Sequence, residues 1–136
     1  MSISVMDIPS EAARAELRLP PDVSAPAFAR RAVNDLLGSL PSPLLGQLSL
    51  IASELVTNVL RHCTAEDHAA TLTLVLAPEC VTLTVTDAGP GFDPSGRRES
   101  DDPAGGWGLQ VLDAVADRWW VERDGGTKVI CEIDRH

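Results

Sequence analysis

Two polar side chains stand one helical turn apart in a stretch that is otherwise largely apolar, Ser49 to His62. Glu54 and Asn58 are four residues apart, so a helix would place them on the same side. The apolar stripe beside them repeats every three or four residues, at Leu48, Ile51, Leu55 and Val59. A carboxylate accepts protons and a carboxamide oxygen is a ligand for hard cations, so the pair is a candidate site. Taken alone, the pair is more typical of the solvated edge of an amphipathic helix.

Two glycine-rich segments later in the chain carry further signals. Residues 87–91, D-A-G-P-G, follow a predicted strand, and on their own they are typical of an ordinary turn. Residues 105–109, G-G-W-G-L, open a predicted helix, where three glycines cost conformational entropy. Backbone N–H groups that must approach an anion at the positive end of the helix would explain that cost. The sequence contains neither a P-loop nor a G-x-G-x-x-G dinucleotide motif.

Composition bounds the class of protein. With 136 residues, 44% of them apolar, the chain is predicted to form one domain with one core. The formal net charge of −9 disfavours non-specific binding to nucleic acid or to an anionic membrane, and no apolar run is long enough to cross a bilayer. The start of the chain lacks the pattern of a secretory signal. Three widely spaced cysteines show no metal-binding pattern, so we expect reduced thiols in a cytoplasmic protein.

Hydrophobic periodicity predicts the elements that must position these residues. Residues 1–13 are expected to be a flexible lead, and residues 14–136 to form the single domain. The elements predicted within the domain are an edge strand over 15–19, a helix over 26–37 capped by Ser24, the central helix over 43–63, strands over 71–76 and 80–86, a helix over 106–117, and a hairpin around residues 124–126. This order predicts an α+β fold with helices on one face of a sheet.

A long polar loop separates the third predicted strand, over residues 80–86, from the helix that follows it. From Asp93 to Gly105 the loop contains no large apolar residue. An interdomain linker is one interpretation, but only about thirty residues follow the loop, too few for a second domain without staples. Long loops within compact domains are usually lids or binding loops. We therefore predict a lid over about residues 92–105.

Together, the three segments resemble the motifs of one family, the GHKL ATPase/kinase superfamily. E-L-V-T-N at 54–58 resembles its N box, whereas D-A-G-P-G-F at 87–92 and G-G-W-G-L at 105–109 resemble its two glycine boxes. The closest similarity is to the anti-sigma-factor serine/threonine kinases and their stand-alone actinobacterial relatives, from about residue 14 to the end. The resemblance implies a Bergerat fold, as in histidine-kinase-type ATPase domains: a two-layer sandwich of a mixed, mainly antiparallel sheet with helices on one face.

The resemblance also implies a role for each matching residue. Glu54 would be the catalytic carboxylate that accepts the proton of an attacking hydroxyl. Asn58 would be the metal ligand, binding a Mg²⁺ ion that bridges the phosphates of ATP. Asp87 would accept a hydrogen bond from the adenine amino group, and Thr127 would join it there.

Further residues implied to contact ATP lie in the glycine boxes and near them. Contacts to the nucleotide are assigned to Gly89, Gly91, Gly106, Gly108 and Leu109. His62 would line the site, although a histidine at a helix end is as often structural. Arg97 would reach the γ-phosphate when the lid closes, and keeping an acidic loop soluble is its alternative role.

The activity implied by the resemblance is that of an ATP- and Mg²⁺-dependent serine/threonine protein kinase. Its substrate would be a STAS-type anti-anti-sigma protein, and it would regulate transcription by sequestering a sigma factor; a homodimer is also implied. Two alternatives stay open: a non-catalytic ATP-binding regulatory module, and a stand-alone histidine-kinase-like catalytic domain acting on a histidine in trans. These residues contain neither a phospho-accepting histidine helix nor a transducer domain, so a complete histidine kinase and a gyrase-like motor are not expected.

Overall fold

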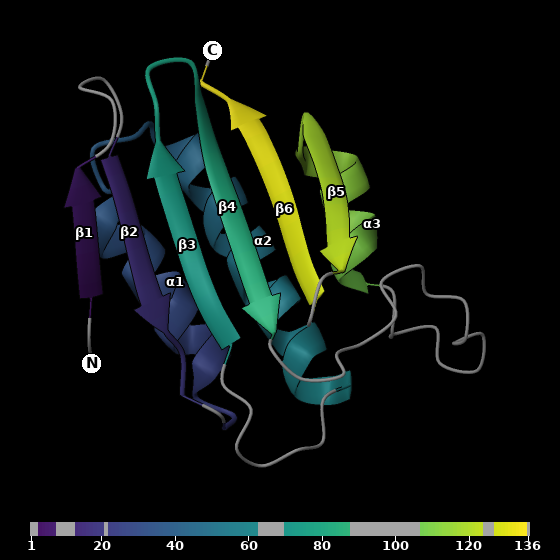
Figure 1. Ribbon diagram of the computed structural model, residues 1–136. Coiled ribbons are helices and arrows are strands. Elements are labelled where there is room, and N and C mark those ends of the chain that lie inside the picture. Colours follow the sequence, from purple (N-terminus) through teal and green to yellow (C-terminus); the bar gives the residue numbers. More distant parts are fainter. Residues whose placement is uncertain are drawn as a thin grey trace.

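The described part of the chain folds into two layers, a six-stranded sheet and three helices on one of its faces (Figure 1). The computed structural model describes residues 3–7, 13–20, 22–62, 70–87, 107–123 and 127–135. The sheet order is β1-β2-β3-β4-β6-β5, and every described ladder is antiparallel. The strands are β1 (Ile3–Asp7), β2 (Ala13–Arg18), β3 (Ala70–Leu76), β4 (Cys80–Asp87), β5 (Arg118–Arg123) and β6 (Thr127–Asp134). The predicted α+β sandwich is therefore confirmed.

All three described helices lie behind the sheet in the view of Figure 1. The helices are α1 (Ala25–Leu36), α2 (Ser42–His62) and α3 (Trp107–Val115). α2 is the middle helix, in contact with α1 and α3 and with strands β3 and β4. No described helix is both long enough and apolar enough to cross a bilayer.

The apolar stripe of α2 fixes the orientation of this helix. Leu48, Ile51 and Leu55 are fully buried, in one cluster with Leu72 of β3 and Leu83 of β4. Burying a side chain of this size stabilises the fold by about 1.5–3 kcal/mol, so rotating the helix about its axis would be strongly unfavourable. The polar residues beside the stripe are thereby held in a fixed direction.

Strict alternation along β4 decides which of its residues face the helices. The odd-numbered residues Val81, Leu83 and Val85 are buried, whereas the threonines between them are more exposed. Because successive side chains of a strand point to opposite faces, the same parity places Asp87 on the helix side. The last residue of β4 is thus a carboxylate aimed into the interior layer.

The amino-terminal part of the chain differs from the prediction. Residues 3–7, expected to lie in a flexible lead, form β1 and pair antiparallel with β2. β2 is consequently an inner strand, held between β1 and β3, so its prediction as an edge strand was wrong. The edge-strand prediction depended on Pro20, which follows the strand. A proline in that position does not show whether the strand is paired on one side or on both.

Ser24 occupies the predicted N-cap position of α1, but its side chain makes no capping hydrogen bond. Its hydroxyl and its backbone N–H both donate to Oδ1 of Asp22. These hydrogen bonds, the hydroxyl's first, lower the pKa of Asp22. The predicted cap was therefore right in position and wrong in bonding, because a nearby carboxylate competes for the hydroxyl.

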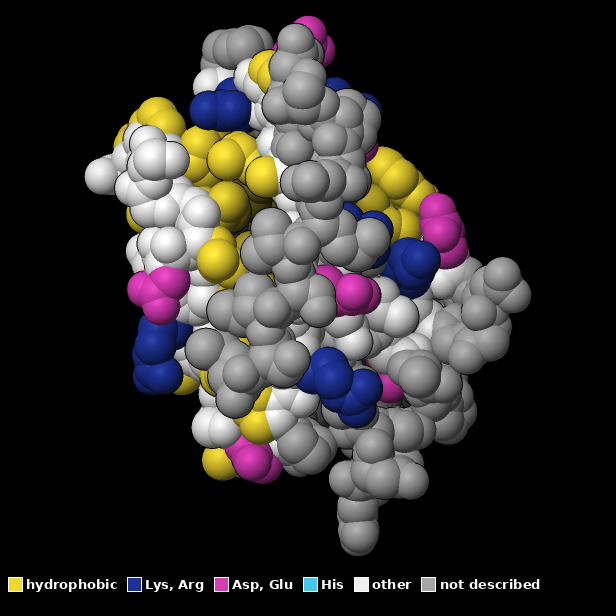
Figure 2. Space-filling view, turned by 60° about the vertical axis from the view of Figure 1, so that its left-hand side comes forward, with side chains coloured by type: hydrophobic (Ala, Val, Ile, Leu, Met, Phe, Trp, Pro, Cys, Tyr) yellow, Lys and Arg dark blue, Asp and Glu magenta, His cyan; other side chains and the backbone are white. Residues whose placement is uncertain are grey.

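Charged side chains are dispersed over the surface seen when the β1 edge is turned forward. Figure 2 shows Lys and Arg side chains interleaved with Asp and Glu side chains on the described part of this face. Opposite charges that alternate in this way largely cancel one another's fields at a distance from the surface. The described basic side chains on this face do not gather into one stripe.

Candidate functional site

Three hydroxyl side chains of α2 have hydrogen-bond partners within the helical layer. The hydroxyl of Ser53 donates to the backbone oxygen of Leu50 at 3.1 Å, and that of Thr57 to the backbone oxygen of Ser53 at 2.7 Å. Ser49 Oγ accepts a hydrogen bond from Asn34 Nδ2 of α1 at 3.1 Å. These groups satisfy helix carbonyls and join α1 to α2, which are structural roles. Glu54 and Asn58 belong to a different face of the same helix.

At the end of β4, two polar residues stand directly opposite each other in the ladder. Asp87 pairs with Thr127, the first residue of β6, and only 1% and 3% of their surfaces are exposed. Residues opposed in an antiparallel ladder have Cβ atoms about 4.5–5.5 Å apart, so one small group can contact both. A buried carboxylate is costly unless it is hydrogen-bonded, and Asp87 does have an interaction within the described structure. The structure therefore places Thr127 beside Asp87, and their predicted contact with adenine stays a prediction.

Three elements bring their ends to the same edge of the sheet. Figure 1 shows the end of β4, the last turns of α2 and the start of α3 together at its lower edge. Asn58, on those last turns of α2, is 4% exposed. A carboxamide, a carboxylate and the positive end of a helix therefore lie around one corner of the fold, which is a suitable environment for a nucleotide's base and phosphates.

Glu54 lies on a shallow groove between α2 and α3. The groove has a volume of about 280 Å³ and is lined by Glu54, Gln110, Val111 and Ala114. The carboxylate of Glu54 is half-buried there, so it remains accessible to a partner. The two residues of the α2 pair therefore differ in exposure: Asn58 is buried, whereas Glu54 is partly accessible from the groove.

The donor set at this corner fits a magnesium ion carried by a nucleotide better than a resident metal ion. Among the described residues, no group of three or more His, Cys, Asp or Glu side chains could hold a metal. Mg²⁺ is usually bound through one or two protein oxygens together with substrate phosphates. Asn58 Oδ1 is a hard oxygen of that kind, so the residues present fit Mg²⁺·ATP.

Several predicted site residues lie outside the described part of the chain. These are Gly89, Gly91, Gly106 and Arg97, together with the predicted lid. Gly108 and Leu109 form the first turn of α3, as the predicted helix start requires. His62 is the last residue of α2, four residues after Asn58. Their proposed contacts to ATP stay predictions.

The groove wall on α3 was not predicted from the sequence. Gln110 and Ala114 are four residues apart and are exposed, on the side of α3 away from the buried Leu112. Helical periodicity could have placed the two residues on one face. It could not have shown that this face lies beside Glu54, because that depends on how α3 packs against α2.

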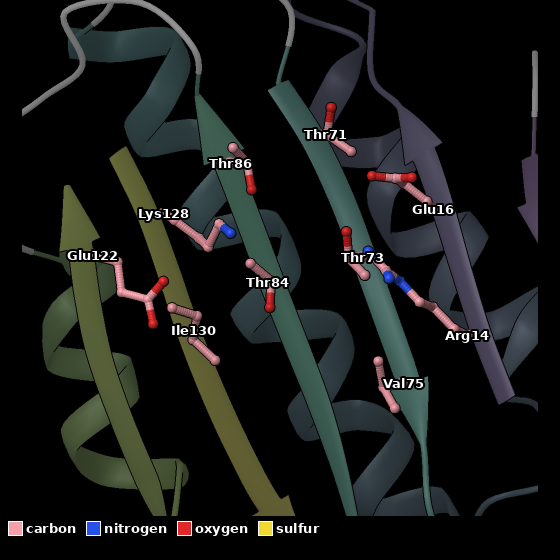
Figure 3. Close-up of a pocket in the computed structure, with 10 residues that line it drawn as sticks. All are labelled: Arg14, Glu16, Thr71, Thr73, Val75, Thr84, Thr86, Glu122, Lys128 and Ile130. Atoms are coloured by element: carbon pink, nitrogen blue, oxygen red, sulfur yellow. The ribbon is translucent and has the colours of Figure 1, made fainter. Parts of the chain in front are cut away.

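A second hollow, of about 600 Å³, lies on the opposite face of the sheet (Figure 3). Its floor is formed by threonines of β3 and β4, with Arg14 and Glu16 on one side and Glu122 and Lys128 on the other. None of the predicted site residues lines it. It is the solvated side of an alternating sheet, so its greater volume does not make it the candidate site.

Comparison with known proteins agrees with this geometry. A family profile described as "Histidine kinase-like ATPase domain" matches residues 19–133. The chain belongs to this family. The match begins just after β2 and runs to the end of β6, so it includes the α2 pair, Asp87 and Thr127. No curated protein gave a significant match.

Among solved structures, the chain is similar to the blue-light activated histidine kinase of Erythrobacter litoralis EL346. The TM-score is 0.56 and the sequence identity 23%, over 80% of this chain and 40% of the other. This likeness shows the fold of a histidine-kinase-type ATPase domain.

Proposed function

We propose that this protein binds ATP as Mg²⁺·ATP and transfers its γ-phosphate to a hydroxyl of a protein partner. The observation that carries the ATP site is the buried pair Asp87 and Thr127 at the end of the β4–β6 ladder. A buried carboxylate accepts a hydrogen bond from the 6-amino group of adenine, whereas the 6-oxo group of guanine would leave two acceptors facing each other. Membership of the histidine kinase-like ATPase family supports the same assignment.

Phosphoryl transfer here requires a proton acceptor and correct positioning. The hydroxyl oxygen of the partner forms a bond to the γ-phosphorus, and the bond from that phosphorus to the β–γ bridging oxygen breaks. ADP leaves with the electron pair of that bond, and the hydroxyl proton passes to a carboxylate oxygen of Glu54. Glu54 suits this role because it is half-buried and opens onto the α2–α3 groove.

Magnesium would be held at the enclosed end of the α2 pair. Mg²⁺ supplies charge neutralisation of the phosphates when it is bound. Asn58 would bind it through Oδ1, and the first turn of α3 would offer backbone N–H groups to the phosphates. Asn58 and Glu54 are one helical turn apart, so metal binding and proton transfer would occur at adjacent positions.

The partner that we propose is a STAS-type anti-anti-sigma protein, with sequestration of a sigma factor as the regulatory output. The support is the resemblance of E-L-V-T-N, D-A-G-P-G-F and G-G-W-G-L to the motifs of the anti-sigma-factor kinases.

Calorimetric titration with ATP and with GTP, each with and without Mg²⁺, tests the nucleotide site. We expect ATP to bind at least about tenfold more tightly than GTP, and Mg²⁺ to strengthen binding. Labelled ATP and a STAS-type protein then test transfer, where Glu54→Gln should keep ATP binding and lower the rate by at least about a hundredfold. Wild-type protein that binds neither nucleotide would contradict the site, and ATP binding without transfer would contradict the kinase activity.

A histidine acceptor is the second candidate, and the family's description as histidine kinase-like favours it. The two acceptors differ in the stability of the product, since phosphohistidine is hydrolysed in acid and phosphoserine is not. An acid-labile phosphorylated partner would therefore decide for histidine. Regulation of the partner that survives Glu54→Gln would instead indicate a non-catalytic ATP-binding module.

A further inference from the structure

We propose that the α2–α3 groove is the docking site for the segment of the acceptor protein that carries the phosphorylated hydroxyl, and that this segment is apolar beside the hydroxyl and basic around it. The proposal rests on the proposed function, because Glu54 forms part of the groove. A partner seated there would bring its hydroxyl to the carboxylate that accepts its proton.

The wall on α2 continues away from Glu54 as an apolar, uncrowded strip. Gly46, Leu50 and Glu54 are spaced by four residues and so follow one side of the helix. Leu50 is 44% exposed, although α2 buries Leu48, Ile51 and Leu55. A Cβ added at Gly46 would meet no atom within 4 Å, so the space beside that turn is open. An apolar side chain of a partner could cover Leu50 without displacing anything.

The wall on α3 is low and leaves room for a main chain. Val111 is partly buried against the core, whereas Gln110 and Ala114 are exposed. The methyl group of Ala114 lets a backbone approach closely, and the carboxamide of Gln110 can both donate to it and accept from it. A shallow groove with a small residue in its wall and one carboxylate fits an extended or helical segment, not a small enclosed ligand.

The charged side chains around the groove indicate which net charge a bound partner segment would carry. None of the four lining residues is basic, and the one charged group among them is Glu54. Two further carboxylates lie on the exposed side of α3 and just after it, at Asp113 and Asp117. Asp113 accepts a hydrogen bond from Trp119 Nε1 at 2.9 Å, and Asp117 accepts one from the backbone N–H of Asp134 at 2.7 Å. Each keeps acceptor capacity, so a basic segment is favoured and an acidic one is repelled.

These charges also argue against a second copy of this chain as the occupant. The formal net charge of the chain is −9, and two copies meeting through this acidic surface would place like charges together. A basic, apolar segment of another protein is therefore the occupant to which the geometry points.

Two fluorescent eleven-residue peptides test the proposal, each with a central serine and an adjacent leucine, one flanked by lysines and one by glutamates. Binding is measured by anisotropy at low salt, with the protein saturated by Mg²⁺ and a non-hydrolysable ATP analogue. We expect the lysine peptide to bind at least about tenfold more tightly. Equal binding of the two peptides, or no binding of either at millimolar concentration, would overturn the proposal.

Matched pairs of variants locate the binding. Leu50→Ser should weaken binding of the lysine peptide about fivefold, and Ala114→Arg, which fills the groove and repels lysines, more than about tenfold. The controls Val23→Ser and Ala13→Arg make the same exchanges at exposed positions far from the groove, and should change it less than about twofold. Nucleotide affinity should be the same in all four. An Ala114→Arg protein that binds the peptide like the wild type would place the docking site elsewhere.

Phosphorylation of the same peptide separates the two hypotheses. If the peptide binds in the groove and receives no phosphate although ATP is bound, the kinase activity is refuted and the docking site stands. If the peptide is phosphorylated and Leu50→Ser and Ala114→Arg leave its KM unchanged, the docking site is refuted and the kinase activity stands.

Discussion

The two ends of the β4–β6 ladder both carry an aspartate, and the two aspartates are in opposite environments. At one end Asp87 faces Thr127 and both are buried; at the other Cys80 faces Asp134, which is exposed. Both strands have eight residues, so the residues at their two ends point to opposite faces of the sheet. Strand length alone therefore places one end pair under the helices and the other on the open face.

The exposed end shows how a surface carboxylate is stabilised. Asp134 accepts a hydrogen bond from Arg118 Nη2 at 2.7 Å, and Glu132 accepts one from Arg118 Nε at 2.6 Å. These two hydrogen bonds, the one donated to Asp134 first, raise the pKa of Arg118. Arg118 is itself about half exposed, so water screens this network and its contribution to stability is small. At the buried end Asp87 lies away from water, where a carboxylate is costly unless it is hydrogen-bonded.

Replacing each aspartate with alanine should give the largest difference in ATP affinity between the two ends of the ladder. Asp87→Ala should weaken ATP binding roughly a hundredfold and abolish the preference over GTP, because the adenine amino group loses its acceptor. Asp134→Ala should leave ATP affinity within about twofold of the wild type, because this carboxylate is on the open face. Calorimetric titration measures both. Similar losses in the two variants would mean that the effect is a general one on the fold.

Alternation in the sequence was sufficient to predict the faces of this ladder. In the repeat T-L-T-V-T-D, Leu83, Val85 and Asp87 alternate with threonines, and the structure buries all three on the helix side. Family resemblance implied that Thr127 joins Asp87 at the adenine; the ladder register places the two residues opposite each other, and the contact with adenine stays a prediction. Pairing of Ile3–Asp7 with β2 was not predictable, since a five-residue strand carries little periodic signal and its partner is set by tertiary contacts.

The groove beside Glu54 shows the same limit within the site. The sequence predicted Glu54 and Asn58 as a pair on one helix face, but the structure encloses Asn58 and exposes Glu54 to the groove. That division depends on where α3 packs along α2, which spacing within one helix does not specify. Local motifs were sufficient to name candidate residues such as Glu54, whereas the position of Ala114 beside Glu54 depends on contact between distant elements and was not predicted.

Cys131, in the middle of the β4–β6 ladder, offers a pH test of whether water reaches the helix-covered face of the sheet. Burial raises the pKa of the Cys131 thiol to about 12, from an ordinary value of 9.0. Below pH 9 the thiol keeps its proton in both states and adds no pH dependence. Between pH 9 and 12 the unfolded state loses the proton first, so the free energy of unfolding should fall by about 1.4 kcal/mol per pH unit.

Urea unfolding from pH 8 to 11 measures this slope, with Cys131→Ala as the comparison. The chain has no tyrosine and one lysine, Lys128, so few other groups titrate in this range. The variant should lose most of the slope above pH 9, and its stability at pH 8 should be lower because the volume of the buried thiol is lost. A variant with the wild-type slope would mean that water reaches the helix side of the ladder, which would weaken the contrast between its two ends.

The smallest expected effect on ATP affinity is that of Thr127→Val. It tests whether the Thr127 hydroxyl contacts the nucleotide or has only a structural role in β6. Thr127→Val keeps the shape and the β-branching of the side chain and removes its hydroxyl, so it should fold normally and bind ATP about fivefold more weakly, the loss of one hydrogen bond. Thr86→Val makes the same exchange on the neighbouring strand, where Thr86 faces the open hollow of Figure 3. It should leave ATP affinity unchanged. If Thr127→Val binds ATP as tightly as Thr86→Val does, the threonine hydroxyl serves the buried Asp87 and not the nucleotide, and adenine recognition rests on the carboxylate alone.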